Sequence, residues 1–465
     1  MSVPIPIWSS GLLAQEGLGV AFSNYLPSRA VQLNPALIAD SRTYIDVHTI
    51  GLSFFGLNDH TYFASEGPGL WSALAGRGTS PVQSDAPGSR SGYIDFSFDG
   101  PGLFKVDGRQ SFGLSTRYRA MFNGRGVPEE LAQLFYHGFR YSPLYDQPLD
   151  LNGMTATAMA WGELNASYAY MLEVTDEHHL NAGITLKRLF GTDHYGLKLG
   201  EADYTFTSQD LRLTGLKGEY AYVKDNLGIG NGWAIDLGLM FRKTIDGRST
   251  YVPFSKKSQC SQSDYKYEWG FSVLDLGAVR FNDNAAYVKV IEADVLWPDY
   301  IDSQLSDLEQ LDVLLMERVE TDQNITRRSS AYKVSLPSAL SLQFDYNFSK
   351  GFHTSAMIQE RIKRGGSFDL WRARVAAVIP RFESKDLEVA LPLSTFEYEK
   401  LRVGLSVRYR SFTLGSDDLI DLALDRDLYG ADIYFSFNIL LLEGSECASS
   451  TKKSPKRLIA PCWGD

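Results

Sequence analysis

Runs of alternating apolar and polar residues recur along the chain and constrain its fold more than any other feature. The heptapeptide "GLSTRYR" (113–119) returns as "GLSVRYR" (404–410), with Leu, Thr or Val, and Tyr on one side and Gly, Ser and Arg on the other. Successive side chains of a β-strand point to opposite faces, so each copy predicts a strand with one apolar and one polar face. The surrounding sequences are not alike, so the two copies indicate a shared strand pattern and not an internal repeat.

About 15 segments follow this period of two, and most are about 10 residues long. Strands of soluble proteins have nearer five or six residues, whereas a strand that crosses a membrane needs about 9–11. The segments are 45–55, 94–99, 112–122, 161–172, 180–189, 218–223, 233–242, 267–281, 286–295, 339–348, 352–362, 371–382, 387–398, 401–412 and 431–439.

The connections between these segments alternate in length. Long ones, at 56–92, 123–155, 190–217, 243–265 and 296–331, take turns with short ones such as "DNAA", "SKG" and "SKD". Short turns on one side and long loops on the other are typical of outer-membrane β-barrels. Both ends of such a barrel lie in the periplasm, which requires an even number of strands. We therefore predict an all-β fold, a single antiparallel transmembrane barrel of about 14 strands, with a counting error near 218–223 or within 383–412.

In a membrane barrel the Leu/Val/Tyr face meets lipid and the Gly/Ser/Arg face lines the interior. An arginine on the lipid face near the bilayer midplane would cost about 2–4 kcal/mol. A large soluble all-β protein with these faces reversed is the alternative. The predicted lumen-lining residues are Arg117, Arg119, Arg408, Arg410, Arg372, Arg374, Glu163 and Asp236. They either form an anion-attracting constriction or pair with one another and fill the interior, and a barrel of this size favours the second.

Composition and charge limit the partners. The 465 residues include 25 Tyr and 26 Phe and carry a formal net charge of −11, which argues against binding to nucleic acid. The apolar runs are far shorter than the roughly 18 residues of a membrane-spanning helix. Nothing in the sequence predicts a cofactor.

The ends of the chain differ from its middle. Residues 1–14 resemble the end of a secretory signal without its basic start, and 15–42 are expected to form a plug-like segment. The barrel is predicted over 43–440, followed by a basic tail, 441–465. Cys447 and Cys462 flank that tail and are a possible disulfide in an oxidising compartment.

Candidate catalytic and metal-binding residues are few. His353 and Ser355 share one face of a predicted strand, but no oxyanion group or third catalytic member is identifiable. The stretch "DEHH" (176–179) occupies a tight turn, where adjacent residues rarely converge on one metal ion. We predict neither an enzyme nor a metal site.

Two segments have helical periodicity. In 301–320 leucines recur on one stripe with acids largely elsewhere, and 127–139 is a shorter candidate. Each is interpreted as a helix that packs over the barrel mouth, or as a lid or docking helix for another envelope protein. The tail is a second candidate contact for such a partner.

Several segments together resemble a Bacteroidota family of outer-membrane β-barrels of unknown function, similar in style to the long-chain fatty-acid transporter barrels. They are "LNPALIAD" (33–40), "VLDLGAVRF" (273–281), "SLPSALSLQFDY" (335–346), "VALPLSTFEYEKLRVGLSVRY" (389–409) and "LGSDDLIDL" (414–422). The resemblance implies a barrel in the cell outer membrane, surrounded by its lipid, with a small N-terminal plug. It implies no catalytic residues.

Two functions of different class are considered. The one that the sequence analysis favours is passive passage of a small apolar or amphiphilic solute through the barrel. The second is a non-transporting scaffold that holds a partner at the cell surface or in a secretion assembly. A continuous lumen with a lateral opening would favour passage, and a lumen blocked by ion pairs and residues 15–42 would favour the scaffold.

Overall fold

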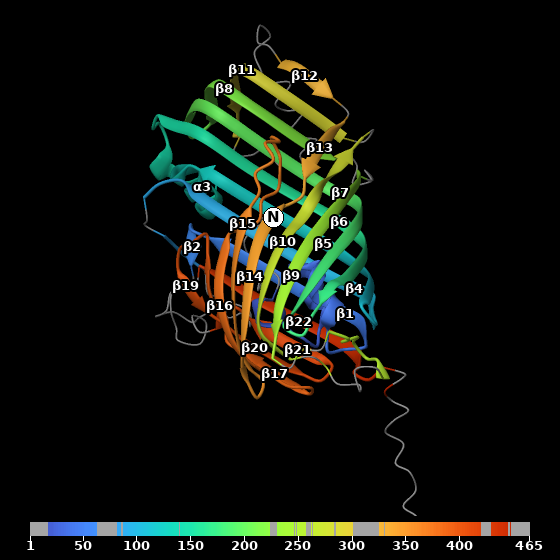
Figure 1. The fold of residues 1–465 in the computed structure, drawn as a ribbon. Helices are drawn as coiled ribbons and strands as arrows, with labels where there is room; N and C mark the ends of the chain where they lie inside the picture. The colour runs from blue at the N-terminus through green and yellow to red at the C-terminus, as the bar shows by residue number, and fades with distance from the viewer. Residues whose placement is uncertain are drawn as a thin grey trace, which may run out of the picture.

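In the computed structural model of this chain, the polypeptide forms a closed antiparallel β-barrel (Figure 1). The structure describes residues 17–62, 81–84, 87–138, 140–223, 230–245, 247, 249–256, 262, 264–282, 285–300, 325–329, 331–419, 429–444 and 447. Fourteen strand positions follow one another around the wall, and the last strand pairs with the first from Ile45↔Leu441 to Leu57↔Gly430. The predicted all-β class and barrel of about 14 strands are confirmed.

Most wall positions are single long strands, and three are each made of two short strands. The order around the wall is β1 (Ile45–Asn58), β4 (Arg90–Asp107), β5 (Gln110–Val127), β6 (Leu149–Val174), β7 (His178–Phe206), β9 (Gly230–Thr244), β10 (Tyr265–Phe281), β13 (Tyr332–Ser335) with β14 (Ala339–Ser349), β15 (Phe352–Arg361), β16 (Val375–Glu383), β17 (Leu387–Ala390) with β18 (Leu393–Phe396), β19 (Leu401–Val403) with β20 (Leu405–Tyr409), β21 (Phe412–Ser416) and β22 (Gly430–Leu441). Pro337 and Pro392 fall at two of the three breaks, where a residue without an N–H costs no ladder bond.

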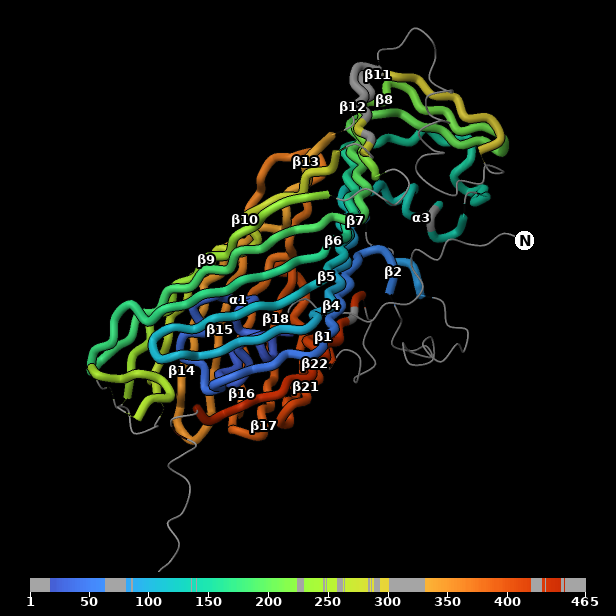
Figure 2. Tube along the Cα trace, turned by 90° about the vertical axis from the view of Figure 1, so that its right-hand side faces the viewer, coloured from blue at the N-terminus to red at the C-terminus, as the bar shows by residue number. Residues whose placement is uncertain are grey.

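The sheet of the wall also extends outward from one side of the barrel. The first half of β7 pairs with β9, but beyond Tyr195 its partner is β8 (Asp210–Val223). β8 pairs with β11 (Ala285–Pro298), and β11 with β12 (Ile325–Ser329). Figure 2 shows these strands leaving the barrel together with α3 (Glu129–His137). We call this part, with the outer ends of β6 and β7, the projection.

The projection has an apolar core of its own. Leu134 of α3 and Leu151, Tyr204, Phe206 and Val295 of the strands are buried together there, apart from the barrel interior. Smaller elements complete this end of the molecule: η3 (Ser142–Leu144) follows α3, and β2 (Thr61–Tyr62) pairs with β3 (Val82–Gln83). The helix predicted over 127–139 is therefore present, whereas 301–320 lies outside the described residues.

The strand count was right in total but wrong in detail. Segments 218–223 and 286–295 belong to β8 and β11, in the projection, and not to the wall. The predicted strand 401–412 ends at Tyr409, and the residues after it form a separate wall strand, β21. These assignments depend on which strands become neighbours, which periodicity within one segment does not reveal.

The two ends of the barrel have different connections. Short turns such as 108–109, 175–177, 350–351, 384–386 and 410–411 lie at one end, and long connections lie at the other. Two predicted connections were assigned to the wrong end: "DNAA" joins β10 to β11 at the long-loop end, and 243–265 lies among the short turns. Ile45 and Leu441 are both at the short-turn end, as an even number of wall strands requires.

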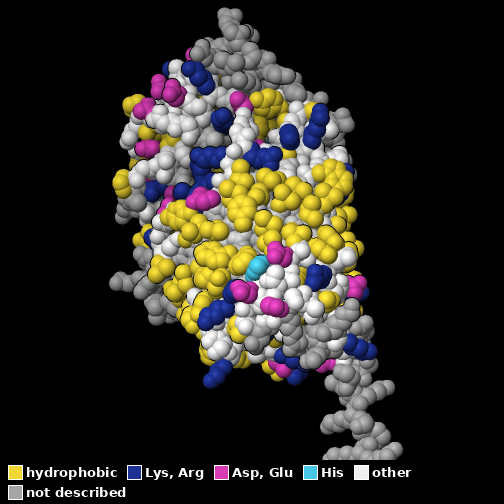
Figure 3. Space-filling model, viewed as in Figure 1, with side chains coloured by type: hydrophobic (Ala, Val, Ile, Leu, Met, Phe, Trp, Pro, Cys, Tyr) yellow, Lys and Arg dark blue, Asp and Glu magenta, His cyan; other side chains and the backbone are white. Residues whose placement is uncertain are grey.

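The outer face of the wall is apolar. Figure 3 shows a band of hydrophobic side chains across the barrel, with charged side chains gathered above and below it. The exposed apolar side chains of the wall strands include Leu114, Leu164, Ile358, Tyr409 and Leu414. Soluble monomers rarely expose large contiguous apolar surfaces. Among the described residues, no helix is long and apolar enough to cross a membrane.

Residues 17–43 fill the short-turn half of the barrel, and we call them the plug. They form η1 (Leu18–Val20), α1 (Pro27–Leu33) and η2 (Pro35–Asp40), and nearly every residue is buried. Asn34 caps η2 by accepting a hydrogen bond from the Ala36 N–H. Pro27 and Pro35 stand at the start of their helices, where an N–H would have no helical partner.

Candidate functional site

The plug is seated against glycines of the inner wall. Asn34 donates hydrogen bonds to the carbonyl oxygens of Leu239 and Phe271, 3.1 and 3.3 Å away on β9 and β10. A Cβ atom at Gly183 or Gly238 would overlap the Asn34–Pro35 segment, so close approach requires glycine at both positions. The plug therefore packs directly against the inner wall and is hydrogen-bonded to it at these positions.

A buried cluster of ion pairs crosses the middle of the lumen and centres on Asp275 of β10. The Asp275 carboxylate lies 2.6 Å from Lys187 Nζ, 2.8 Å from Arg119 Nη1 and 2.6 Å from Arg372 Nη2. Asp236 accepts a hydrogen bond from the Asp275 N–H and pairs with Lys187 at 2.8 Å. We call these five residues the hub.

Asp275 reaches the hub through an irregularity in its strand. The pairing of β10 with β9 shifts register between Val273 and Leu276, and Asp275 has φ of 55°. Few residues other than glycine, asparagine and aspartate adopt this left-handed conformation readily, and bulges of this kind often re-aim a side chain. Leu274 and Asp275 are consequently both buried, although they are adjacent.

Two more acids and a tryptophan surround Arg119. Glu163 lies 3.6 Å and Asp95 3.8 Å from its guanidinium group. Trp161 donates a hydrogen bond to Glu163 and lies with its ring centroid 4.9 Å from the Arg119 guanidinium carbon. The predicted residues Arg119, Glu163, Asp236 and Arg372 thus meet inside the barrel, whereas the sequence analysis did not single out Asp275 or Lys187.

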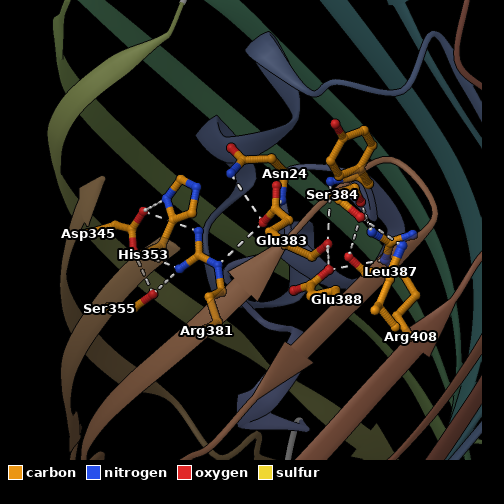
Figure 4. Close-up of polar contacts among 12 residues, drawn as sticks. Asn24, Asp345, His353, Ser355, Arg381, Glu383, Ser384, Leu387, Glu388 and Arg408 are labelled. Atoms are coloured by element: carbon orange, nitrogen blue, oxygen red, sulfur yellow. Dashed lines mark hydrogen bonds and ion pairs between the residues drawn. The ribbon is translucent and has the colours of Figure 1, made fainter. Parts of the chain in front are cut away.

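Nearer the short-turn end of the lumen, a second network of hydrogen bonds and ion pairs joins the plug to β16, β17 and β20 (Figure 4). Ser23 donates to Glu388 at 2.6 Å, and Arg408 reaches the same carboxylate at 3.1 Å. Asn24 donates to Glu383, which lies 3.3 Å from the Arg381 guanidinium. The wall arginines therefore fix acids that in turn hold the plug.

His353 and Ser355 belong to this network around Asp345 and Arg381. Ser355 donates to Asp345 at 2.7 Å, and His353 Nδ1 lies 3.4 Å from the same carboxylate (Figure 4). Arg381 neutralises Asp345 at 2.6 Å. Among the described contacts, Ser355 and His353 each interact with Asp345, and no hydrogen bond joins the two side chains. Within the described part of the chain, no group of three or more His, Cys, Asp or Glu could hold a metal ion.

The inward arginines face acids on neighbouring strands. Arg117 stands opposite Asp99 of β4 and Glu163 of β6, and it pairs with Asp99 at 3.1 Å. Arg408 stands opposite Glu388 of β17. Arg29 of the plug also pairs with Asp99, at 2.6 Å. Complementary charges at matched inward positions fill the lumen here.

Two predicted residues lie elsewhere. The prediction was wrong for Arg410, whose side chain is 66% exposed and pairs with Asp386 at the short-turn end. β20 ends at Tyr409 and Arg410 adopts φ of 52° in the following turn, so the alternation of its strand no longer determines where it points. Arg374 precedes β16 and lies at the long-loop mouth, partly exposed, beside Glu397.

Residues 362–374 connect β15 to β16 by passing into the barrel from the long-loop end. We call this segment the inner loop. Phe368 and Leu370 are buried, and Trp371 donates its N–H to the Asn123 side chain at 3.0 Å. The inner loop packs on an apolar zone of the lumen formed by residues that include Met121, Met159, Leu189, Val279, Ile379 and Phe396. The guanidinium group of Arg372, in the same loop, reaches the hub.

Above the inner loop lies a cavity of about 360 Å³, which we call the outer cavity. Arg125, Arg361, Lys363 and Arg374 line it, together with Tyr93 and Trp371. Asp59, at its edge, accepts a hydrogen bond from the Ser91 N–H, but burial nonetheless raises the pKa of the Asp59 carboxyl. A second cavity of about 30 Å³, between plug and wall, has no lining residue in common with the first.

Two segments cover the short-turn end of the barrel. One is the connection between β9 and β10, which contains Tyr251, and the other is the segment after β22, which contains Cys447. Tyr251 is buried, donates to Asp40 of the plug at 2.9 Å and stacks on His179. Asp40 also pairs with Arg242 at 2.6 Å. Cys447 packs near Phe254 and takes part in a disulfide; Cys260 and Cys462 both lie outside the described residues.

Comparison with solved structures finds other barrels at low identity. A FadL homologue of Pseudomonas aeruginosa is 12% identical, covers 92% of this chain and 98% of its own, and superposes with a TM-score of 0.41. The toluene transporter TodX of P. putida is 11% identical, with coverage of 92% and 96% and a TM-score of 0.39. The toluene transporter TbuX of Ralstonia pickettii is 11% identical, with coverage of 89% and 93% and a TM-score of 0.39.

No curated protein matches the chain significantly. A family model, in contrast, matches residues 35–417, from the plug through the last wall strand but one. The match includes the hub, the inner loop and the residues of the outer cavity. The chain belongs to the family described as "Family of unknown function (DUF5723)".

Proposed function

We propose that this chain is a non-conducting outer-membrane barrel that carries a docking platform, the projection, at the cell surface. The observation that carries the proposal is the filling of the barrel interior by the plug, the hub and the inner loop. Plug, hub and inner loop follow one another from the short-turn end to the long-loop end, and each is bonded to the wall. An ion that crossed this interior would have to displace buried charge pairs, which are costly to separate once desolvated.

Location in the outer membrane is supported by the wall itself. Its apolar side chains face outward in one band, and its arginines face inward onto acids. Short turns at one end and long connections at the other indicate which end faces the periplasm. The projection, at the long-loop end, then lies on the outside of the cell.

The projection supports the docking role because a barrel does not need it. A transmembrane strand needs about 9–11 residues, whereas β6 and β7 have 26 and 29. Their outer parts pack with α3 around a separate apolar core. A folded unit of this kind presents a fixed surface to a partner, which we propose to be another envelope protein.

Passage of a small apolar or amphiphilic solute is the second candidate. The apolar zone beneath the outer cavity favours it, because such a zone would accept an apolar solute once the inner loop moved aside. This candidate requires the hub to open as well, since Arg372 of the inner loop is one of its members.

Conductance of the purified barrel in planar bilayers, with solute efflux from liposomes, tests the proposal. We expect no channel events above those of protein-free bilayers, and an open porin reconstituted in parallel gives the positive control. A variant that lacks residues 17–43 and 363–373 should conduct, which shows that the wall encloses a pore when it is emptied. Steady conductance or solute efflux by the unaltered protein would overturn the non-conducting assignment.

Photo-crosslinking in native cells tests the platform. A crosslinking amino acid at Thr214, exposed in β8, should give one adduct of constant mass, and the same residue at Leu114, in the apolar band, should give none. Thr214 and Leu114 reacting with the same set of proteins would contradict a dedicated docking surface.

A further inference from the structure

The lining of the outer cavity holds four cations, Arg125, Arg361, Lys363 and Arg374, and three acids, Asp59, Glu397 and Glu399. Glu397 lies beside both Arg361 and Arg374, so one carboxylate serves two guanidinium groups. Arg125 and Lys363 have no ion-pair partner among the described residues. The cations of the lining therefore outnumber its acids.

Arg361 has an unsatisfied hydrogen-bond donor beside this cavity. Its side chain is 8% exposed, yet its Nη1 atom is buried and makes no hydrogen bond. A buried guanidinium nitrogen without an acceptor is costly, and such groups are uncommon in native structures. Because Arg361 lines the outer cavity, an acceptor that enters the cavity can satisfy it.

The floor of the cavity is aromatic. The Arg125 and Arg361 guanidinium carbons lie 3.7 and 4.7 Å from the centroid of the Trp371 ring, and Tyr93 packs on Trp371 with ring centroids 5.2 Å apart. Guanidinium groups held on a tryptophan face are fixed in orientation, and their N–H groups are suited to bidentate recognition of a carboxylate or phosphate.

We propose that the outer cavity is a binding site for a small organic anion, whose carboxylate or phosphate lies between Arg361 and Arg125 and whose apolar part rests against Trp371 and Tyr93. Lys363, exposed at the rim, adds long-range attraction for the anion. A volume of about 360 Å³ is at the small end of ligand pockets, so the ligand has the size of one ring with its acid group. The site is independent of whether the lumen conducts.

Isothermal titration calorimetry on the folded barrel in detergent tests this site, with benzoate as the probe and with benzyl alcohol and inorganic phosphate for comparison. We expect saturable binding of benzoate that weakens as salt is raised, and weaker binding of both other compounds. Benzyl alcohol binding as well as benzoate would refute recognition of the anion. Phosphate binding as well as benzoate would refute the role of the aromatic floor.

Variants locate the site. Arg125→Gln and Arg361→Gln should each weaken benzoate binding about tenfold or more, equivalent to about 1.4 kcal/mol. Arg280→Gln is the matched control, because Arg280 is exposed near the same end of the barrel and does not line the cavity. Arg125→Gln also guards against misfolding, since it breaks no ion pair. Unchanged affinity in both cavity variants, or no binding by the unaltered protein, would overturn the proposal.

Discussion

The carboxylate of Asp275 and the guanidinium group of Arg372 lie 2.6 Å apart, joining a bulge of β10 to the loop that enters the barrel between β15 and β16. Asp275 also neutralises Arg119 and Lys187, so one buried acid holds three cations from different parts of the chain.

Replacing Asp275 by Asn should destabilise the barrel by about 3–5 kcal/mol, because buried cations would lose their counter-charge. The free energy of unfolding in lipid vesicles, from urea titration, measures this. Asp386→Asn is the matched control, since Asp386 is half-exposed and its pair with Arg410 should contribute less than about 1 kcal/mol. Equal effects of the two substitutions would refute the central role of the hub.

Leu114 tests the assignment of the outer face to lipid. Leu114→Arg should cost up to about 2–4 kcal/mol if the position lies near the bilayer midplane, and less toward the interfaces. Leu114→Ala removes the same side chain without adding charge and should cost much less. The same urea titration in vesicles gives both values, and an arginine that cost no more than alanine would contradict the contact of Leu114 with the hydrocarbon interior.

Tyr251 should protect the plug. Tyr251→Phe removes one hydrogen bond to the Asp40 carboxylate, a loss of about 1.5–3 kcal/mol for a bond to a charged group. Tyr251→Ala also removes the ring that stacks on His179. Limited trypsin digestion should therefore cut after Arg42 faster in the phenylalanine variant and fastest in the alanine variant. Identical cleavage rates in all three proteins would contradict this closure of the short-turn end.

The three cysteines should differ in their reactivity toward an alkylating reagent. Cys447 takes part in a disulfide, so the oxidised chain should offer one free thiol to iodoacetamide under denaturing conditions and three after reduction. Mass spectrometry of the alkylated protein counts them, and the linked peptides identify the partner. Three reactive thiols in the unreduced protein would contradict the disulfide.

Much of the wall could be predicted from sequence because period two is a local property. The alternation in 113–119 correctly sets Leu114 and Tyr118 outside and Arg119 inside. It could not reveal that 218–223 and 286–295 pair with each other outside the wall, because pairing joins segments far apart in the chain. Arg410 was misplaced because nothing in its heptapeptide marks the end of the strand one residue earlier.

The interior held signals that periodicity alone does not convey. Asp275 interrupts the alternation of "VLDLGAVRF", and a charged residue out of phase in a wall strand indicates a bulge that turns it inward. Acids at inward positions of adjacent strands, such as Asp99 and Glu388, could have identified the partners of Arg117 and Arg408 once the register was known. The outer cavity depends on the inner loop, whose path no local pattern determines.

β7 runs without interruption from the wall into the platform, and this continuity has a mechanical consequence. From Gly191 to Phe206 the strand advances by roughly 50 Å at about 3.3 Å per residue, with β6 hydrogen-bonded beside it for most of that length. Two paired strands that continue from the wall resist bending, although the register of β6 and β7 shifts between Ala160 and Trp161, near the base of this pair. A protein bound at the far end of the projection would be held at a defined distance from the bilayer. A force applied to that protein would be transmitted through β6 and β7 to the strands of the barrel wall.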